Sequence, residues 1–563
     1  MTAQLALLFS TLFCFLLSAA ASPVAPQQYP RRTENGLHLP LTRRVERRAG
    51  GLTGAIGLGD FVDVTYSFLA TIGGVETPLV LDTGSSDLWI ASDACKDCAA
   101  SSVPLFPQAS FSPAGMDVRL LYGDSLTGTH AAGLIGTDDV SFAGLTIPKQ
   151  YFAAINDTDT NVLATGCAGI FGLGFALNSV IWNQVFAATF NPSTSSPSPR
   201  AARRLVPNYA TRFFPNLSNL LSPSSPKRDS TPDTAVLTRA VLASYAAEGP
   251  ALTRMVATAA LAAPMFVITL QRNTLDVGGN AGVLSLGELP AGVQASALTW
   301  APVRGYPGAL QAPADSPNEM YPIAWELFVD DVFLDGARLP RSNLSSSAIA
   351  LSALVDTGNS LLRGPADVVA VLNARLGAGG TFPCATPHTL AFSIGGTLFP
   401  VDPRDFAAQQ VEGSLDECVA NVVETDAPVE GQGYQYSWSL GDPFLKGVLA
   451  AFHYGNITYP SVDPPRIGLL STVPADAGTL LQSAIADAVK SNGGDVFSAT
   501  TPAPTGVPVA PGSGTSGVPL APPPVGKIGG DGGSGNSNAA RPAIRASWVV
   551  VLVGAAVGLV GLV

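Results

Sequence analysis

The chain has 563 residues, with 58 glycines, 46 prolines and only 13% charged side chains. It is longer than one average domain, and frequent glycine and proline turns between strand-sized apolar segments favour an all-β protein. The formal net charge of −12, without a basic face in the sequence, argues against a nucleic-acid partner.

The first 21 residues have the pattern of a signal peptide. An apolar core at residues 5–17 is followed by small residues up to Ser22. This core is too short to span a membrane, and the small residues predict cleavage after Ala21. A secreted chain can keep disulfides and accept glycans at Asn-x-Ser/Thr sequons. The candidate acceptors are Asn156, Asn216, Asn343 and Asn456.

Residues 22–48 are predicted to be a propeptide. They end in two dibasic pairs, Arg43-Arg44 and Arg47-Arg48, and the sequence becomes glycine-rich directly afterwards. In a secreted chain this pattern favours removal by a kexin-like processing protease after Arg48. The alternative is a solvated basic segment.

The phrase Asp-Thr-Gly occurs twice, starting at Asp82 and at Asp356, each time after an apolar run that reads as a buried strand. A carboxylate at the end of a buried strand is costly unless it is used. One such loop in each half of the chain indicates a duplicated lobe. Two carboxylates brought face to face share a proton and can act together as acid and base.

Residues 191–233 are rich in serine and proline with scattered arginines. Such a segment cannot build a core and is expected to be a surface insertion, either nicked by proteolysis or simply long. Apolar residues at helical spacing predict helices over residues 235–260 and 366–376.

The composition changes again near residue 473. Residues 473–538 are rich in Gly, Pro, Ser and Ala and are predicted to be a flexible stalk. Small residues, a polar spacer and an apolar tail follow, which is the order of a GPI-attachment signal over residues 539–563. Asn538 is the expected attachment site, with Asn536 and Ser537 as competitors. The alternative is a membrane-spanning helix.

Five ordered motifs resemble those of the pepsin-like aspartic proteases over roughly residues 55–470. They are Asp82-Thr83-Gly84-Ser85-Ser86-Asp87-Leu88-Trp89, Leu121-Tyr122-Gly123-Asp124, the glycine-rich residues 169–174, Val355-Asp356-Thr357-Gly358-Asn359-Ser360-Leu361-Leu362, and residues 438–444. The resemblance implies an all-β, bilobal fold, a double β-barrel or sandwich. The N-terminal lobe would span residues 49–290 and the C-terminal lobe residues 291–472, with the active-site cleft between them under a flap hairpin.

The resemblance also implies roles for individual residues. Asp82 and Asp356 would activate a water without a metal or cofactor, and propeptide arginines could pair with them in a zymogen. Their expected support is Thr83, Gly84, Ser85, Thr357, Gly358, Asn359 and Ser360. The expected flap and substrate-binding residues are Tyr122, Gly123, Asp124 and Trp89. Asp124 would either pair with a basic substrate side chain or be merely solvated.

The cysteines are assigned by the same resemblance. It pairs Cys95 with Cys98 and Cys384 with Cys418. Cys167 is then left as a buried thiol or as an intermolecular partner.

The sequence therefore predicts a secreted, monomeric aspartic endopeptidase that cleaves polypeptides at acidic pH. By resemblance it is of the fungal, GPI-anchored, yapsin-like type, held at the outer side of the plasma membrane or in the cell wall. The alternative is a catalytically silent pepsin-fold binding or inhibitor protein. The two intact Asp-Thr-Gly triplets disfavour that alternative.

Overall fold

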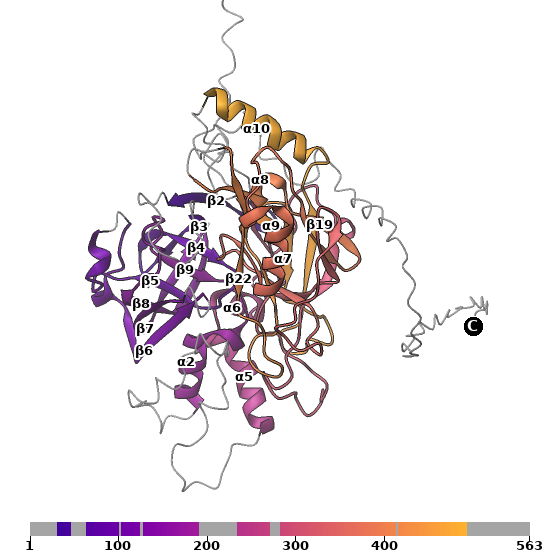
Figure 1. The fold of residues 1–563 in the computed structure, drawn as a ribbon. Helices are drawn as coiled ribbons and strands as arrows, with labels where there is room; N and C mark the ends of the chain where they lie inside the picture. Colours follow the sequence, from indigo (N-terminus) through magenta and orange to yellow (C-terminus); the bar gives the residue numbers. More distant parts are fainter. Residues whose placement is uncertain are drawn as a thin grey trace, which may run out of the picture. The chain divides into compact units, whose positions relative to one another are not determined.

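The computed structural model describes residues 31–46, 63–100, 103–123, 128–190, 234–270, 282–411 and 415–491. These residues fall within one compact unit. Several predictions lie outside them: the signal peptide, the insertion at 191–233, most of the stalk, the GPI signal, and the residues Asp124, Asn216 and Asn538. Most of the regular structure is β-strand, which confirms the predicted fold class (Figure 1).

Six strands of the first half close into a barrel, because the last strand of the series returns to pair with the first. In order around the barrel they are β3 (Asp63–Ile72), β4 (Val75–Asp82), β9 (Gly169–Gly172), β5 (Leu88–Ala91), β8 (Leu145–Thr158) and β7 (Thr129–Phe142). The β3–β4 turn is made by Gly73 and Gly74, whose φ angles of 55° and 84° suit glycine. Strand β6 (Ser112–Tyr122) pairs with β7 and forms the arm of the predicted flap hairpin.

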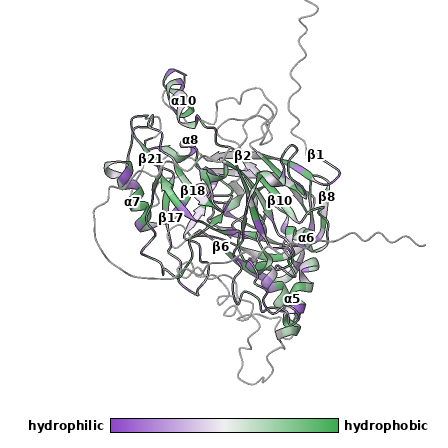
Figure 2. Cartoon of the chain, turned by 90° about the vertical axis from the view of Figure 1, so that its right-hand side faces the viewer, coloured by the Kyte–Doolittle hydropathy of each residue, from purple (hydrophilic) through white to green (hydrophobic). Residues whose placement is uncertain are grey.

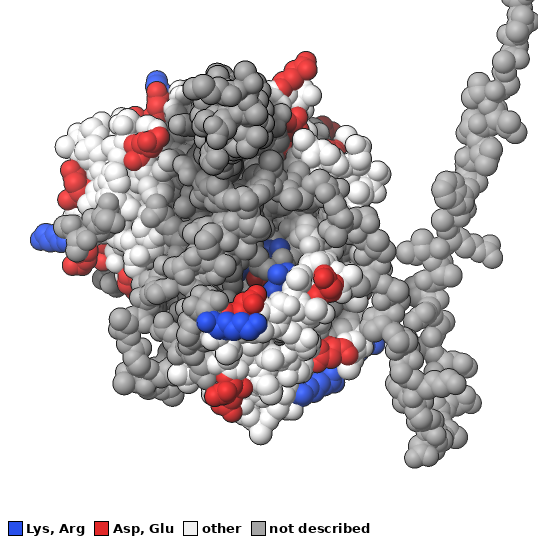
Figure 3. Space-filling view, turned by 90° about the horizontal axis from the view of Figure 1, so that it is seen from above, with Lys and Arg blue, Asp and Glu red and all other residues white. Residues whose placement is uncertain are grey.

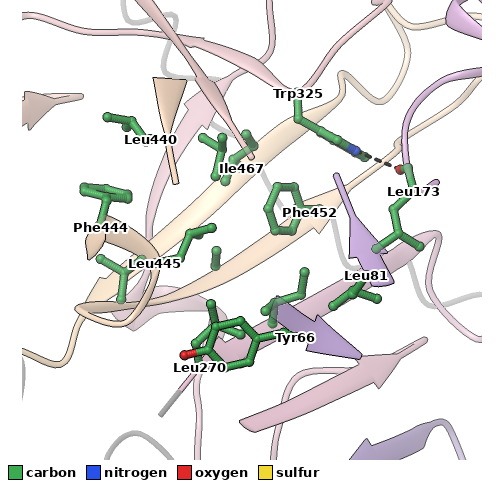
Figure 4. Close-up of a cluster of buried hydrophobic side chains, with 14 of the residues drawn as sticks. Tyr66, Leu81, Leu173, Leu270, Trp325, Leu440, Phe444, Leu445, Phe452 and Ile467 are labelled. Atoms are coloured by element: carbon green, nitrogen blue, oxygen red, sulfur yellow. Dashed lines mark hydrogen bonds between the residues drawn. The ribbon is translucent and has the colours of Figure 1, made fainter. Parts of the chain in front are cut away.

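A run of antiparallel strands continues from the barrel and draws on both halves of the chain. In order they are β2 (Leu37–Glu46), β11 (Gly282–Leu286), β10 (Met265–Leu270), β24 (Val448–His453), β25 (Arg466–Ser471) and β12 (Thr299–Pro302), and the short β1 (Arg31–Arg32) pairs with β2. Its buried side chains form a core that the two halves share, and Figure 4 shows Leu81 of the first half near Phe452 of the second. The Trp325 indole nitrogen donates to the Leu173 carbonyl over 2.9 Å in the same region.

Strand β2 lies inside the segment predicted to be a propeptide. It pairs with β11 on one side and β3 on the other. Leu37, Leu39 and Leu41 are at most 3% exposed. Residues 31–46 of this segment are therefore part of the folded structure of the uncleaved chain, and cleavage after Arg48 stays a prediction.

The second half adds smaller sheets. A five-stranded sheet has the order β13 (Glu326–Phe328), β16 (Ser352–Val355), β23 (Trp438–Leu440), β17 (Leu362–Pro365) and β22 (Val422–Thr425). A four-stranded sheet has the order β15 (Ala337–Arg338), β14 (Asp331–Leu334), β18 (Leu390–Ile394) and β19 (Thr397–Pro400). Strands β20 (Ala407–Gln409) and β21 (Cys418–Ala420) form a separate pair.

The described helices are α2 (Val180–Phe190), α5 (Thr234–Glu248), α6 (Ala251–Ala257), α7 (Ala366–Leu376), α8 (Pro403–Phe406), α9 (Asp442–Leu445) and α10 (Ala477–Ser491). Helix α7 has the predicted bounds. The helix predicted over residues 235–260 is instead two, α5 and α6, separated at Gly249-Pro250, because proline lacks an N–H and disfavours helix in the residue before it.

Helix α10 corrects the predicted start of the stalk. It lies beside α8 at the end of the second half (Figure 1). Leu481 and Ile485 are buried, whereas Val489 is 64% exposed, so one face of α10 packs on the core and the other faces solvent. In Figure 2, which is coloured by hydropathy, α10 carries both hydrophilic and hydrophobic residues, and the inner strands are mostly hydrophobic. The folded part therefore extends to residue 491. None of the helices in the described ranges is long and apolar enough to cross a membrane.

Candidate active site

The two Asp-Thr-Gly loops have the same local topology. In the first half, β4 ends at Asp82, and β9 lies parallel to β4 and antiparallel to β5, the strand that follows the loop. In the second half, β16 ends just before Asp356, and β23 lies parallel to β16 and antiparallel to β17. Two of the motifs, residues 169–174 and 438–444, supply these inserted strands, β9 and β23. Each loop therefore connects two strands that both pair with the same inserted strand, β9 in the first half and β23 in the second.

Threonine side chains join the two loops. The backbone N–H of Thr83 donates to the Thr357 hydroxyl, and the N–H of Thr357 donates to the Thr83 hydroxyl, each over 3.0 Å. The two hydroxyls then donate to the carbonyls of Val355 and Leu81. Both threonines are at most 2% exposed. This buried, reciprocal set fixes the two carboxylates relative to each other.

Gly84 and Gly358 allow the loops to approach closely. A Cβ atom on Gly84 would lie 2.4 Å from Asp356 Oδ1, and one on Gly358 would lie 2.5 Å from Asp82 Oδ1. Any larger residue at either position would push the opposite carboxylate away. The geometry thus places Asp82 and Asp356 directly opposite each other.

The two carboxylates have different neighbours. The Ser85 hydroxyl donates to Asp82 Oδ2, and the Gly84 N–H donates to Asp82 Oδ1. Asn359 stands where the second loop would place the counterpart of Ser85, but its amide donates to the Ser439 hydroxyl instead. Asp356 accepts from the Gly358 N–H. Ser360 is half-buried beside this loop. Asp82 therefore has one more donor within its own loop.

This asymmetry decides where the shared proton resides. Burial raises the pKa of both carboxyls, and the negative charge of Asp82 adds to burial in raising the pKa of Asp356 to about 8. The hydrogen bonds from Ser85 and Gly84 oppose the rise at Asp82 because they stabilise its ionised form. Asp356 is the better holder of the proton, and Asp82 is the better base.

A cleft surrounds the dyad and is lined by residues of both halves, including Tyr122, Asn178, Arg363 and Tyr434. Among the described lining residues, Arg363 is the only lysine or arginine. Its charge lowers the pKa of Asp356, opposing burial. Its Nε lies 3.3 Å from Asn359 Oδ1. The cleft is therefore acidic at its centre, with one cation on the side of the second half.

The flap residues lie over the first loop. Tyr122 ends β6, and its ring lies 6.5 Å from that of Trp89. The Tyr122 hydroxyl and the Trp89 indole nitrogen are buried and lack a well-formed hydrogen bond to any described residue, although Trp89 and Ser85 lie near the hydroxyl. Burial and the charges of Asp87 and Asp82 raise the pKa of Tyr122 well above its usual value. Gly123 follows at a φ of 83°. The neutral Tyr122 hydroxyl keeps its hydrogen-bonding capacity for a bound molecule.

Asp87 lies in the first motif and lines the cleft, although the sequence predicted no role for it. Asp87 accepts hydrogen bonds from the Ser179 hydroxyl and from the N–H groups of Val180 and Ile181, at the start of α2. Burial raises its pKa to about 6. The signal for this role was the aspartate inside the first motif, but its partners lie 92 to 94 residues away. Asp87 fixes the entry to α2 against the first active-site loop.

Other predicted sites lie away from the dyad. Disulfides join Cys95 to Cys98 and Cys384 to Cys418, and Cys167 is buried outside both. Asn156 and Asn343 are exposed, whereas Asn456 is half-buried and accepts two backbone hydrogen bonds. On the face drawn in Figure 3, acidic and basic side chains are scattered among uncharged ones.

Comparison with known proteins agrees with this geometry. The family model of the eukaryotic aspartyl proteases matches residues 66–193 and 240–459, and each matched stretch contains one Asp-Thr-Gly loop. An aspartic protease of Phaffia rhodozyma is 25% identical over 418 residues, which cover 72% of this chain and 75% of that protein. Rhizopuspepsin-2 of Rhizopus niveus is 26% identical over 416 residues (71% and 79%), and pepsin A of Rhinolophus ferrumequinum is 25% identical over 429 residues (73% and 84%). With its two catalytic loops inside a match that spans more than half its length, the chain belongs to the eukaryotic aspartyl protease family and is an aspartic endopeptidase.

Proposed function

We propose that the protein is a secreted, cell-surface aspartic endopeptidase that hydrolyses polypeptides at acidic pH. The observation that carries the proposal is the facing pair of carboxylates, in which Asp82 accepts hydrogen bonds from Ser85 and Gly84, and Asp356 accepts one from Gly358. An acid and a base at one point are what hydrolysis of an amide requires.

The catalytic step follows from this pair. A water bound between the carboxylates would lose a proton to Asp82 as its oxygen attacks the scissile carbonyl carbon. Protonated Asp356 would donate a hydrogen bond to the carbonyl oxygen, where negative charge develops. The proton taken by Asp82 then passes to the leaving amine as the C–N bond breaks. The threonine bonds keep this geometry constant through the cycle.

Activity at acidic pH is compatible with the need for one shared proton. The dyad must hold one proton and one negative charge, and proton loss from Asp356 ends activity at high pH. Burial raises both pKa values, so the singly protonated state persists well above the usual range of an aspartate. The singly protonated dyad is therefore present at acidic pH and persists toward neutral pH.

The location outside the cell is proposed from sequence features at both ends of the chain. The signal peptide at residues 1–21 supports secretion, and the terminal segment 539–563 supports GPI anchoring at Asn538. The resemblance to yapsin-like fungal enzymes supports the same location. Maturation by a kexin-like protease would then occur on the way to the surface, and the protein would act as a monomer.

The proposal is tested with a chain spanning residues 22–491. It is incubated with denatured haemoglobin from acidic to neutral pH, with and without pepstatin. Asp82→Asn is compared with Asn343→Gln, an exposed change outside the cleft. We expect acidic, pepstatin-sensitive cleavage that only Asp82→Asn abolishes. Cleavage that persists in Asp82→Asn would contradict the assignment of the base.

The surface location needs a separate measurement. Phosphatidylinositol-specific phospholipase C should release the full-length protein from intact cells, and Asn538→Gln together with changes at Asn536 and Ser537 should prevent surface attachment. Retention after the phospholipase would favour a membrane-spanning helix over a GPI anchor.

A further inference from the structure

One part of the cleft wall is a hydrogen bond between the two halves of the chain. The Tyr434 hydroxyl donates to Asn178 Oδ1, and both residues line the cleft that contains the dyad. Asn178 lies just before α2 in the first half, and Tyr434 lies between β22 and β23 in the second. The wall at this point is therefore continuous from one half to the other.

Each partner of this bond is held in place by its own half. Asn178 is followed by Ser179, whose hydroxyl donates to the buried Asp87 over 2.5 Å. The Tyr434 ring packs on Tyr436 at 5.7 Å, and the next N–H along the chain donates to the Tyr306 hydroxyl over 3.0 Å. These anchors distinguish the bond from a chance contact between two loop tips.

Packed side chains from both halves lie behind the bond. Tyr434 contacts a buried cluster made of Leu177, Trp182 and Phe186 from the first half, Val241 and Tyr245 from α5, and Tyr306, Leu310, Tyr321 and Ile323 from the second half. Packed side chains therefore fill the space on the far side of the bond, and within the described part of the chain no open channel passes behind it.

Helix α5 joins the two sides of this cluster. The Trp182 indole nitrogen of α2 donates to the Ser244 hydroxyl of α5 over 3.0 Å. The Thr238 hydroxyl of α5 donates to the Gln311 carbonyl of the second half, also over 3.0 Å. Helix α5 begins in the stretch between residues 193 and 240 that the family model leaves unmatched. Thr238 therefore lies outside the matched stretches, whereas Trp182 and Ser244 lie within them.

A closed wall restricts how a substrate can lie across the dyad. An extended peptide advances about 3.3 Å per residue. To be cut in its middle, it must leave the cleft at both ends. We propose that the Asn178–Tyr434 wall closes the cleft at one end. On the endopeptidase function proposed above, the enzyme would then select peptide bonds that lie a few residues from a free chain end, in unfolded polypeptides.

The test uses peptides that share one cleavable core and are extended by a few residues on either the amino or the carboxyl side. For the wild type, we expect extension on one side to lower kcat/KM by roughly tenfold or more, equivalent to about 1.4 kcal/mol. Extension on the other side should have little effect. The readout is the ratio of long to short substrate, so each variant serves as its own reference.

Two variants probe the wall. Tyr434→Ala should bring the ratio close to one, and Tyr434→Phe, which keeps the ring but loses the hydroxyl, should give an intermediate ratio. Tyr459→Phe is the matched control, because its hydroxyl bonds exposed Asp315 outside the described cleft lining. It should keep the wild-type ratio. If Tyr434→Ala does not fold, Asn178→Ala removes the acceptor from the other side of the bond.

The outcomes separate this inference from the proposed function. Equal cleavage of all peptides by the wild type, or a one-sided penalty that survives in every wall variant, would overturn the closed end. If the wild type cleaves no peptide at all, the proposed function fails first. The closed end can then be tested without catalysis, from the dissociation constants of statine inhibitors that are extended on one side or the other. Weaker binding of inhibitors extended on one side, restored by Tyr434→Ala, would support the closed end. Equal binding of all inhibitors would overturn it.

Discussion

Thr83 and Thr357 exchange hydrogen bonds across the boundary between the two halves of the chain, each backbone N–H donating to the other hydroxyl over 3.0 Å. The two residues are 274 positions apart in sequence, yet each completes the hydrogen bonding of the other's loop. The catalytic geometry therefore depends on both halves at once, and neither half can hold its aspartate in position alone.

Replacing one of these threonines tests that dependence. Thr83→Val keeps the shape but leaves the Val355 carbonyl and the Thr357 N–H without their partner. Each buried group left unsatisfied costs about 1–3 kcal/mol. We expect a lower free energy of unfolding in urea and a lower kcat. Thr146→Val, which removes one exposed hydroxyl contact, is the matched control and should change neither value. Equal stability of the two variants would argue against the exchange.

Tyr122 should separate activity from stability. Its buried hydroxyl lacks a well-formed hydrogen bond to any described residue, so Tyr122→Phe removes a desolvated polar group at little cost. We expect the free energy of unfolding to stay the same or rise. If the hydroxyl binds substrate, we expect kcat/KM to fall roughly tenfold or more. A tenfold fall corresponds to a loss of about 1.4 kcal/mol of binding free energy in the transition state. Parallel thermal denaturation and peptide kinetics measure both. A variant that loses stability and keeps full activity would assign the hydroxyl to the fold.

The repeated loops were predictable from sequence, and their surroundings were not. Asp82 and Asp356 could be identified because the same phrase follows an apolar run twice. The bond between Asn178 and Tyr434 spans 256 positions and joins two residues that belong to no motif. Local patterns carry no information about such a pairing, because it depends on how the two halves pack.

At two boundaries one local signal drew attention away from another. The dibasic pairs marked residues 22–48 as a propeptide, although Leu37, Leu39 and Leu41 alternate as in a half-buried strand. Abundant glycine and alanine likewise hid the helical spacing of Leu481 and Ile485. In both cases the apolar periodicity agreed with the structure.

Strand β2 leads to a prediction about folding. Burying Leu37, Leu39 and Leu41 contributes about 1.5–3 kcal/mol for each side chain. A chain spanning residues 49–491 should therefore fold poorly, and a synthetic peptide of residues 31–48 added in trans should restore folding. The chain 31–491, which keeps β2, serves as the control. Circular dichroism and urea unfolding report the result. A 49–491 chain with the same unfolding midpoint as the control would show that β2 is dispensable.

Helix α10 should contribute to the stability of the second half. Leu481 is fully buried, and replacing a buried leucine with alanine costs about 2–5 kcal/mol. Leu481→Ala should lower the urea midpoint by a corresponding amount. Val489→Ala, on the exposed face of the same helix, should stay within about 0.5 kcal/mol of the wild type. A chain ending at residue 472 should resemble Leu481→Ala or be weaker. Identical midpoints for both alanine variants would contradict the packing of α10.

The dyad also predicts how stability changes with pH. The pKa of Asp356 is raised from 3.8 to about 8 in the folded protein, chiefly by burial and then by the charge of Asp82. Between these values the folded state binds more protons than the unfolded state, so the free energy of unfolding falls as pH rises from about 4 to about 8. Below pH 3.8 the carboxyl is neutral in both states and the loss disappears.

Asp356→Asn, which cannot ionise, should therefore be more stable than the wild type at pH 8 and equal to it at pH 3.5. Thermal unfolding of both proteins across this range measures the difference, with Asp330→Asn, an exposed aspartate, as the control. A constant difference between wild type and Asp356→Asn at all pH values would show that Asp356 does not carry the raised pKa.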